Sequence, residues 1–236
     1  MKKFSLTFIC MALVCVLAFV TAFPKSDLWA TSKTMINSPQ IILDAGHGGF
    51  DGGAVAQDGT VEKDINLKIC ITLADFLKSN GYKVIMTRST DVSTDDVETK
   101  TISTRKKSDL KNRLELMRDY PDAVFVSIHL NKFTTSAAFG SQVFYSAKDK
   151  DSKILGEDIQ KSIVSMLQPE NMRVNKKATS STYLLHNATI PAVLVECGFL
   201  SNKAELEKLK NSEYQRKMAF CIYCGINNYF SNNKEI

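Results

Sequence analysis

Two patterns of apolar and polar positions alternate along the chain from about residue 40 onward. Short, nearly continuous apolar runs such as Ile41–Leu43 and Val124–Ile128 have the composition of buried strands. Between such runs lie longer segments in which apolar residues recur every three or four positions, as Ile65, Ile69 and Leu73 do. Strands therefore alternate with amphipathic helices, which is the pattern of the α/β class.

We expect a single α/β domain with a mostly parallel, twisted sheet of about six strands and helices on both faces. The polar stretch 89–103 has no apolar period and is expected to form a long surface loop of the kind that shapes access to a site. The predicted strands are 40–44, 82–88, 123–129, 141–146, 182–186 and 191–196, and the predicted helices are 62–79, 104–119, 150–167, 203–210 and 213–230.

The beginning of the chain has the composition of an export segment. Lys2 and Lys3 precede an uncharged apolar run that ends at Phe23, as in a secretory signal peptide. Since that run is about 20 residues long, an uncleaved signal anchor is the alternative, and the remainder is exported in either case. We expect a signal peptide or signal anchor over residues 1–23, a polar linker over 24–38 and the folded domain over 39–236.

Charge and composition exclude one class of partner. The chain has 236 residues, 44% of them hydrophobic, which is enough to bury a sizeable core. Its formal net charge of +5 falls to +3 when Lys2 and Lys3 leave with the export segment, a value too small to indicate nucleic-acid binding. A weak contact with an anionic polymer of the cell envelope stays open.

The six cysteines do not form a disulfide pattern. Cys10 and Cys15 lie in the export segment, and Cys70 lies within a helical apolar pattern. Cys221 and Cys224 form a C-x-x-C pair, but the spacing places both on one apolar face of a predicted helix. We interpret them as buried thiols, because free cysteine packs as a small hydrophobic residue.

Polar residues with metal-binding or catalytic chemistry follow three of the predicted strands. His47 lies in a glycine-rich loop after the first strand, and His129 ends the strand 123–129. Glu62 begins the helix after the glycine loop, and Glu196 ends the strand 191–196. Because ligands bind beyond the carboxyl ends of strands in open α/β sheets, these residues are expected to share one cleft.

The combination suggests a zinc hydrolase. Catalytic zinc takes three ligands such as His47, Glu62 and His129 and keeps a fourth position for water, whose pKa it lowers. A carboxylate outside this ligand set is needed to accept and return a proton, and Glu196 suits that role. Each residue taken singly also has an ordinary structural explanation, and the joint occurrence favours the site. Glu62 is the least constrained, because no H-E-x-x-H motif fixes its spacing.

Two further residues offer alternatives. Cys197 could act as a nucleophile with His129 as its base, but consecutive strand residues point to opposite faces, so that Cys197 and Glu196 would not share a cleft. We therefore interpret Cys197 as a packing residue. His186, the third histidine, is expected at a strand end on the surface rather than in the site.

Four ordered motifs resemble the zinc-dependent N-acetylmuramoyl-L-alanine amidases of the amidase type 3 family. They fall in the family's order and span nearly the whole chain after residue 40. The single-domain layout is most similar to the germination-specific spore-cortex amidases of Gram-positive spore formers. The matching motifs are Leu43–Gly49 (LDAGHGG), Glu62–Leu67 (EKDINL), Ser127–Asn131 (SIHLN) and Pro191–Asn202 (PAVLVECGFLSN).

The resemblance implies that His47, Glu62 and His129 hold zinc and that Glu196 is the catalytic carboxylate. It further implies cleavage of the amide between the lactyl group of N-acetylmuramic acid and L-alanine in peptidoglycan. In the spore-cortex relatives this cut prepares muramic lactam formation, required for germination, which implies a location in the cell envelope or the forespore intermembrane space. His186 stands where relatives often carry a basic residue, so that substrate contact is an alternative to its surface role.

Two other readings of the site stay open. One is a catalytically silent envelope module that binds zinc or glycan. The other is an amidase that holds zinc weakly and needs an accessory envelope protein to complete or stabilise its site, because three ligands on separate elements must be preorganised.

Overall fold

The computed structural model describes residues 38–96 and 101–232, and from Pro39 onward these described residues belong to one compact unit. The predicted export segment 1–23 and the linker through residue 37 lie outside the described residues. The strands are β1 (Gln40–Ala45), β2 (Lys83–Met86), β3 (Ala123–Asn131), β4 (Gln142–Tyr145), β5 (Lys176–Lys177) and β6 (Ala192–Phe199). The helices are α2 (Glu62–Ser79), α3 (Ile102–Asp119), α4 (Asp151–Met166), α5 (Tyr183–Asn187), α6 (Lys203–Lys210) and α7 (Ser212–Asn232).

The six strands form one sheet in the order β2-β1-β3-β6-β4-β5. The four strands from β2 to β6 run parallel, whereas β4 is antiparallel to β6 and β5 is parallel to β4. The predicted α/β class and mostly parallel sheet are therefore confirmed. The central strands β1, β3 and β6 are neighbours, so that their carboxyl ends lie together at one edge of the sheet.

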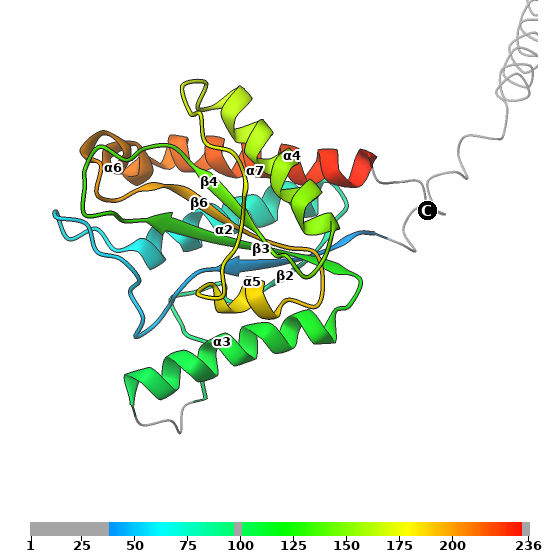
Figure 1. Cartoon of the computed structure of the whole chain (residues 1–236). Coiled ribbons are helices and arrows are strands. Elements are labelled where there is room, and N and C mark those ends of the chain that lie inside the picture. The colour runs from blue at the N-terminus through cyan, green and yellow to red at the C-terminus, as the bar shows by residue number, and fades with distance from the viewer. Residues whose placement is uncertain (1–37, 97–100, 233–236) are drawn as a thin grey trace, which may run out of the picture. The chain divides into compact units, whose positions relative to one another are not determined.

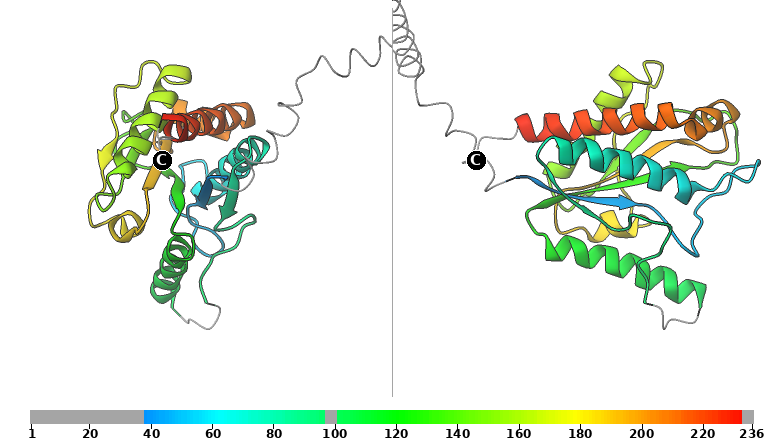
Figure 2. Two further views of the ribbon diagram at one scale, coloured as in Figure 1. Left: turned by 90° about the vertical axis from the view of Figure 1, so that its right-hand side faces the viewer. Right: turned by 180° about the vertical axis from the view of Figure 1, so that it is seen from behind.

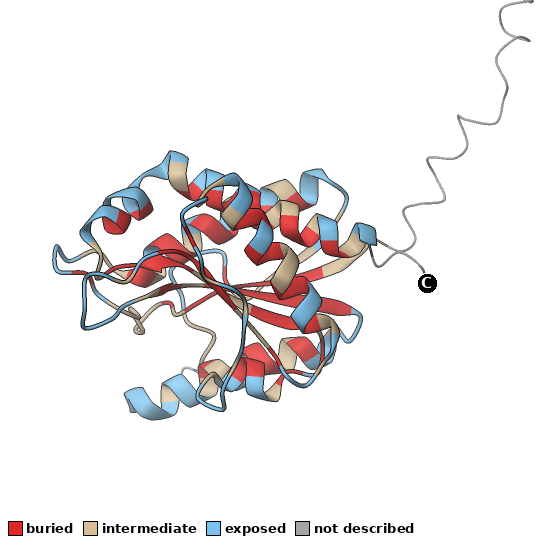
Figure 3. Ribbon diagram, turned by 45° about the horizontal axis from the view of Figure 1, so that its top comes forward, coloured by how far each residue is buried: buried red, intermediate tan, exposed pale blue. Residues whose placement is uncertain are grey.

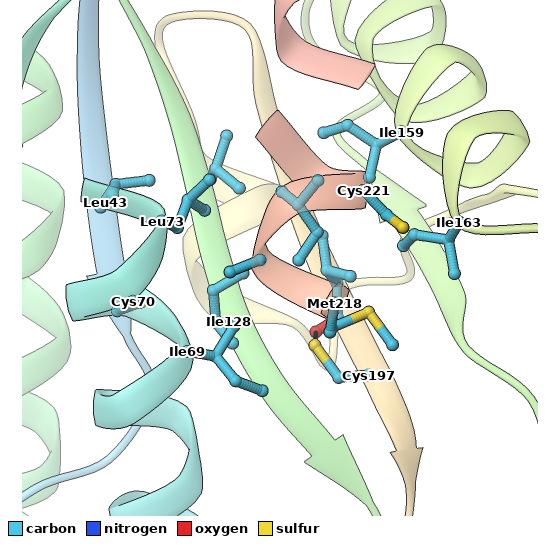
Figure 4. Close-up of a cluster of buried hydrophobic side chains, with 14 of the residues drawn as sticks. Leu43, Ile69, Cys70, Leu73, Ile128, Ile159, Ile163, Cys197, Met218 and Cys221 are labelled. Carbon is cyan, nitrogen blue, oxygen red and sulfur yellow. Dashed lines mark hydrogen bonds between the residues drawn. The ribbon is translucent and has the colours of Figure 1, made fainter. Parts of the chain in front are cut away.

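Helices cover both faces of this sheet (Figures 1 and 2). On one face α2, α4 and α7 pack over the larger core cluster, and on the other α3 and α5 pack over a smaller one. Figure 4 shows Leu73, Ile128 and Met218 meeting in the larger cluster, with Cys197 among them. No helix within the described parts of the chain is long and apolar enough to cross a bilayer.

Helix α2 forms as its sequence predicts, and this places Glu62 beside the glycine loop. Glu62 and Asp64 occupy the first turn, where the helix dipole favours negative charge. The apolar stripe is buried against the sheet, and Gly81 adopts a φ of 84° directly after the Asn80 cap. The predicted bounds, 62–79, are those observed.

One predicted strand is wrong. Residues 182–186 were expected to extend, but Tyr183–Asn187 is the short helix α5. Leu184 and Leu185 are both buried in the smaller core cluster, and two adjacent side chains of a strand point to opposite faces. The sixth strand is instead β5, which lies between the predicted helix 150–167 and residues 182–186, where no strand was expected. The expected number of strands is therefore correct with one member replaced.

The cysteines within the described residues are all free. Cys70, Cys197 and Cys221 are buried in the larger core cluster, and Cys224 is half-buried. The predicted packing role is confirmed for Cys70, Cys197 and Cys221, whereas Cys224 is less buried than expected.

Candidate metal centre

The candidate residues lie together at the carboxyl ends of the central strands. In the β3–β6 register His129 is paired with Glu196. His47 follows β1 by two residues, and the amide N–H of Gly46 still donates to the carbonyl of Ile128 on β3, 3.1 Å away. Tertiary structure therefore brings these residues together from three separate strands and the start of α2.

His47, Glu62 and His129 form a cluster able to hold a metal ion. Their ligand atoms lie within 4.8 Å of one another. Glu62 is central: its Oε2 is 3.4 Å from Nε2 of His47, and its Oε1 is 3.0 Å from Nδ1 of His129. The two imidazole rings meet edge to face, with centroids 4.9 Å apart. Two histidines and one carboxylate match the ligand types of catalytic zinc sites.

The glycines of the loop leave room for these ligands. A Cβ atom on Gly46 would lie 2.3 Å from two atoms of the His129 ring, and one on Gly53 would lie 2.6 Å from Oε2 of Glu62. No side chain fits at either position. His47 itself has a φ of 63°, a left-handed conformation that few non-glycine residues adopt. The glycine loop thus lets the backbone lie against the ligands.

Hydrogen bonds orient the ligands from behind. Asp51 places its Oδ2 2.9 Å from Nδ1 of His47, leaving Nε2 for the metal. The Glu62 carboxylate is 3% exposed and accepts the amide N–H groups of Ala54 at 2.8 Å and Leu130 at 3.0 Å. This arrangement is the outer layer of hydrogen bonds that metal-binding histidines and carboxylates require.

The charges of the cluster favour a bound cation. Burial by itself would raise the pKa of Glu62. The hydrogen bonds with His129 and His47 lower it by more, so that the net pKa lies well below its usual range. Burial lowers the pKa of His47, yet bonds to Asp51 and Glu62 raise it to about 9. A protonated His47 and a bound cation are alternative partners for these carboxylates, so that metal binding would release a proton from His47.

Glu196 lies beside the cluster without a partner. It is half-buried, and its Oε2 atom is buried and makes no hydrogen bond. Burial, together with the charge of Glu62, raises the pKa of Glu196 to about 7, although His129 and His47 oppose the shift. An unpartnered buried carboxylate oxygen next to a metal-competent cluster needs a polar ligand, such as water or a substrate group.

The two alternatives from the sequence lie elsewhere. Cys197 is fully buried in the core cluster drawn in Figure 4, on the opposite face of β6 from Glu196, and burial raises its thiol pKa well above the usual range. His186 is exposed on α5, beside Lys148 and Lys177. Lys148 follows β4, which runs antiparallel to β6 and ends beside the amino end of that strand. His186 therefore lies away from the candidate site, which is at the carboxyl end of β6.

Sequence reasoning missed a buried arginine pair that supports the loop. Arg88 donates to the carbonyls of Ala45 and Gly46, at 2.9 and 3.1 Å. Arg113 donates to the carbonyls of Ala45 and His47, at 3.0 and 2.8 Å. The two side chains are 3% and 2% exposed, respectively. The only local signal was the spacing of four between Asp109 and Arg113, which is common on exposed helices as well.

The chain matches a known protein family over most of its length. The profile of the family Amidase_3, described as N-acetylmuramoyl-L-alanine amidase, matches residues 41–228. A germination-specific N-acetylmuramoyl-L-alanine amidase of Bacillus subtilis strain 168 is 35% identical over 226 residues, which cover 96% of this chain and 94% of that protein.

Solved structures give the same result. The CwlD amidase from Clostridioides difficile, in complex with the GerS lipoprotein, is 43% identical with a TM-score of 0.80, covering 83% of this chain and 100% of that chain. An N-acetylmuramoyl-L-alanine amidase from Clostridium difficile 630 is 30% identical with a TM-score of 0.72, covering 84% and 99%. Since the family profile spans most of the sequence and these folds superpose, the chain belongs to the N-acetylmuramoyl-L-alanine amidase family, Amidase_3.

Proposed function

We propose that this amidase is zinc-dependent and hydrolyses the amide between the lactyl group of N-acetylmuramic acid and L-alanine in peptidoglycan. The observation that carries the proposal is the His47, Glu62 and His129 cluster with the unpartnered Glu196 carboxylate beside it. The ligand types, the hydrogen bonds behind them and the space kept by Gly53 fit zinc.

In this proposal each ligand enters from a different element. His47 comes from the glycine loop, Glu62 from the start of α2, and His129 from the end of β3. A bound zinc ion supplies Lewis acidity at the scissile carbonyl and lowers the pKa of water. Asp51 keeps the proton on Nδ1 of His47, so that Nε2 presents its lone pair.

Glu196 is assigned the proton transfers. Its carboxylate accepts a proton from the attacking water as the C–O bond forms, and it returns that proton to the departing amine nitrogen as the C–N bond breaks. The products are the lactyl carboxylate and a stem peptide that begins with alanine. A pKa near 7 suits a group that must both accept and donate a proton at neutral pH.

The biological setting is proposed from the relatives. The similar Bacillus subtilis protein is named germination-specific, which supports a role in spore-cortex modification that leads to muramic lactam formation. Residues 1–23 are proposed to direct export, as a cleaved signal peptide or as a retained anchor, with 39–236 as the catalytic domain in the cell envelope or the forespore intermembrane space.

An accessory envelope protein is also proposed. The CwlD amidase was solved in complex with the GerS lipoprotein, and we infer that this chain has a lipoprotein partner of the same kind. A partner that stabilises the zinc site should tighten zinc binding. The test is a zinc titration of the amidase with and without an equimolar lipoprotein; an unchanged affinity contradicts the stabilising role.

Digestion of purified peptidoglycan tests the reaction itself. We expect free peptides beginning with L-alanine by mass spectrometry, and about one zinc ion per chain by metal analysis. The variant Glu196→Gln should keep the zinc and lose cleavage, whereas Glu170→Gln, at an exposed glutamate outside the site, should behave as the native protein. Bound zinc with intact amides would instead indicate a silent binding module.

A further inference from the structure

Helix α3 is joined to the rest of the domain in two different ways along its length. Its second half buries Leu114 and Met117 in the smaller core cluster. Its first half contributes no residue to that cluster, and Figure 3 shows it largely exposed where the helix extends from the sheet. Leu110, at the end of this half, packs against the edge of the cluster, and the guanidinium of Arg105 lies 3.9 Å from the ring centroid of Phe50. The first half also makes polar contacts.

Three residues of α3 lie on the side that faces the glycine loop. Lys106, Asp109 and Arg113 are spaced by three and four residues, which places them on one face of a helix. Asp109 accepts hydrogen bonds from Nε and Nη2 of Arg113, at 2.8 and 3.2 Å, and so fixes the plane of the guanidinium group.

Arg113 holds the backbone of His47. Its Nη2 donates to the His47 carbonyl at 2.8 Å, and its Nη1 donates to the carbonyl of Ala45 and to the buried carboxylate of Asp44. All three nitrogens of the guanidinium group therefore donate hydrogen bonds. The two bonds to the carbonyls of Ala45 and His47 lie on either side of Gly46. A left-handed φ at His47 is unfavourable for a side chain with a Cβ, so that outside contacts must maintain it.

Lys106 acts on the side chain of the same histidine. Its Nζ lies 2.9 Å from Oδ1 of Asp51, and the other oxygen of that carboxylate lies 2.9 Å from Nδ1 of His47. The chain of contacts runs from α3 through Asp51 to the imidazole. His47 is therefore held by α3 at its carbonyl and, through one carboxylate, at its ring.

The first half of α3 is itself fixed by the loop that follows β2. Arg105 pairs with Asp95 at 2.6 Å, and Asp109 accepts the Thr94 amide N–H at 2.7 Å. From the same loop, Asp91 accepts the amide N–H of Gly49 at 2.8 Å. The polar loop predicted at 89–103 thus links α3 to the glycine loop, in addition to any effect on access.

We propose that α3 is a positioning element for the metal centre, in which Lys106 and Arg113 set the ring and the backbone of His47. The proposal rests on the proposed zinc site. In this proposal α3 controls metal affinity through its contacts with His47 and Asp51. The side chain of Lys106 is 49% exposed, so that salt should screen its ion pair with Asp51.

Lys106→Met and the neighbouring Lys107→Met make a matched pair. Both remove one exposed lysine from the first half of α3, but no ion pair involves Lys107 within the described residues. Loss of an outer hydrogen-bond partner typically weakens metal binding by about 10- to 100-fold, and Lys106 acts one step further out. We expect Lys106→Met to weaken zinc binding by roughly three- to tenfold and Lys107→Met to leave it unchanged.

Two readouts separate positioning from a general structural effect. In an Asp51→Asn background, Lys106→Met should have no further effect on zinc affinity, and Lys106→Arg should restore most of the native affinity. Raising the salt concentration should weaken zinc binding by the native chain more than by Lys106→Met. Equal losses in both backgrounds, or no difference between Lys106→Met and Lys107→Met, would overturn the proposal.

The metal-free chain separates this proposal from the proposed function. The imidazole resonances of His47 in NMR spectra should shift in Lys106→Met and in Arg113→Lys, and stay in place in Lys107→Met. If these shifts occur and the native chain binds no zinc, the zinc function fails while α3 still positions His47. If Arg113→Lys does not fold, the two lysine variants decide the outcome, since both change exposed residues.

Discussion

Replacing Gly46 with alanine is the sharpest test of the metal centre, because it adds one methyl group at a known contact. The new Cβ would lie 2.3 Å from both Cε1 and Nε2 of His129 and 2.7 Å from Cδ2. Carbon atoms in contact are separated by about 3.5 to 4.0 Å, so the ring would have to move by roughly 1 Å. The φ of Gly46 is not in the left-handed region, and the perturbation is therefore steric.

A shift of this size removes His129 as a ligand. Metal–ligand distances are held to about 0.2 Å in functional sites, so that a displacement of roughly 1 Å breaks the bond. Loss of an outer-shell partner already costs about 10- to 100-fold in affinity, and loss of a direct ligand should cost at least about 100-fold. Amidase activity should fall with zinc occupancy.

The assay is a competition titration with a chromophoric zinc chelator, with circular dichroism as a control for folding. Gly52→Ala is the matched variant: its Cβ would meet only the Cγ1 of the Val61 side chain, at 3.2 Å, and we expect near-native zinc affinity. The reasoning is refuted if Gly46→Ala folds and binds zinc as tightly as Gly52→Ala.

Three further predictions concern the proton carrier, the buried network and the choice of nucleophile. Glu196→Gln should lower the turnover of a soluble muropeptide by about 100- to 10,000-fold without changing zinc content, and parallel losses of both would contradict its role in proton transfer. Burial raises the pKa of Asp44, but Arg113 and Ser127 lower it more, so its stabilising charge is fully present above pH about 4 and is lost as the pH falls through the lowered pKa. Asp44→Asn should therefore cost about 3–5 kcal/mol in urea unfolding at pH 7 and less below pH about 4, and a cost that does not depend on pH would refute this account. Activity should be lost to a chelator, restored by zinc and insensitive to a thiol-alkylating reagent; inactivation by the reagent with modification of Cys197 would favour a cysteine mechanism.

Most helices and strands could be predicted from the sequence, because the signals that define each of them lie within its own segment. The bounds of α2 follow from an acidic first turn, an apolar stripe and a terminal glycine, all within one segment. The apolar runs of β1, β3 and β6 are buried on both faces in a parallel sheet, and continuous apolar runs are typical of such strands. The strand predicted at 182–186 was wrong, because two adjacent leucines are compatible with a short helix or a strand until the surrounding core is known.

Sequence also identified the residues of the candidate site, because rare residue types ended apolar strands. His47 follows β1 by two residues and His129 lies near the end of β3, whereas β6 continues past the predicted end at Glu196 to Phe199. Glu62 was assigned through the resemblance more than through spacing. The observed cluster of His47, Glu62 and His129 agrees with that assignment, while zinc binding and the role of Glu196 stay predictions.

Only the tertiary structure decided how the cluster is held. Arg113 and Lys106 reach His47 and Asp51 from a helix more than 50 residues away along the chain, and nothing in their local sequence distinguishes them from solvated basic residues on a helix surface. Gly46 is required by the ring of His129, which arrives from another strand. Periodicity reports which face of a segment is buried, whereas a hydrogen bond or a steric limit between distant segments exists only once the sheet has brought them together.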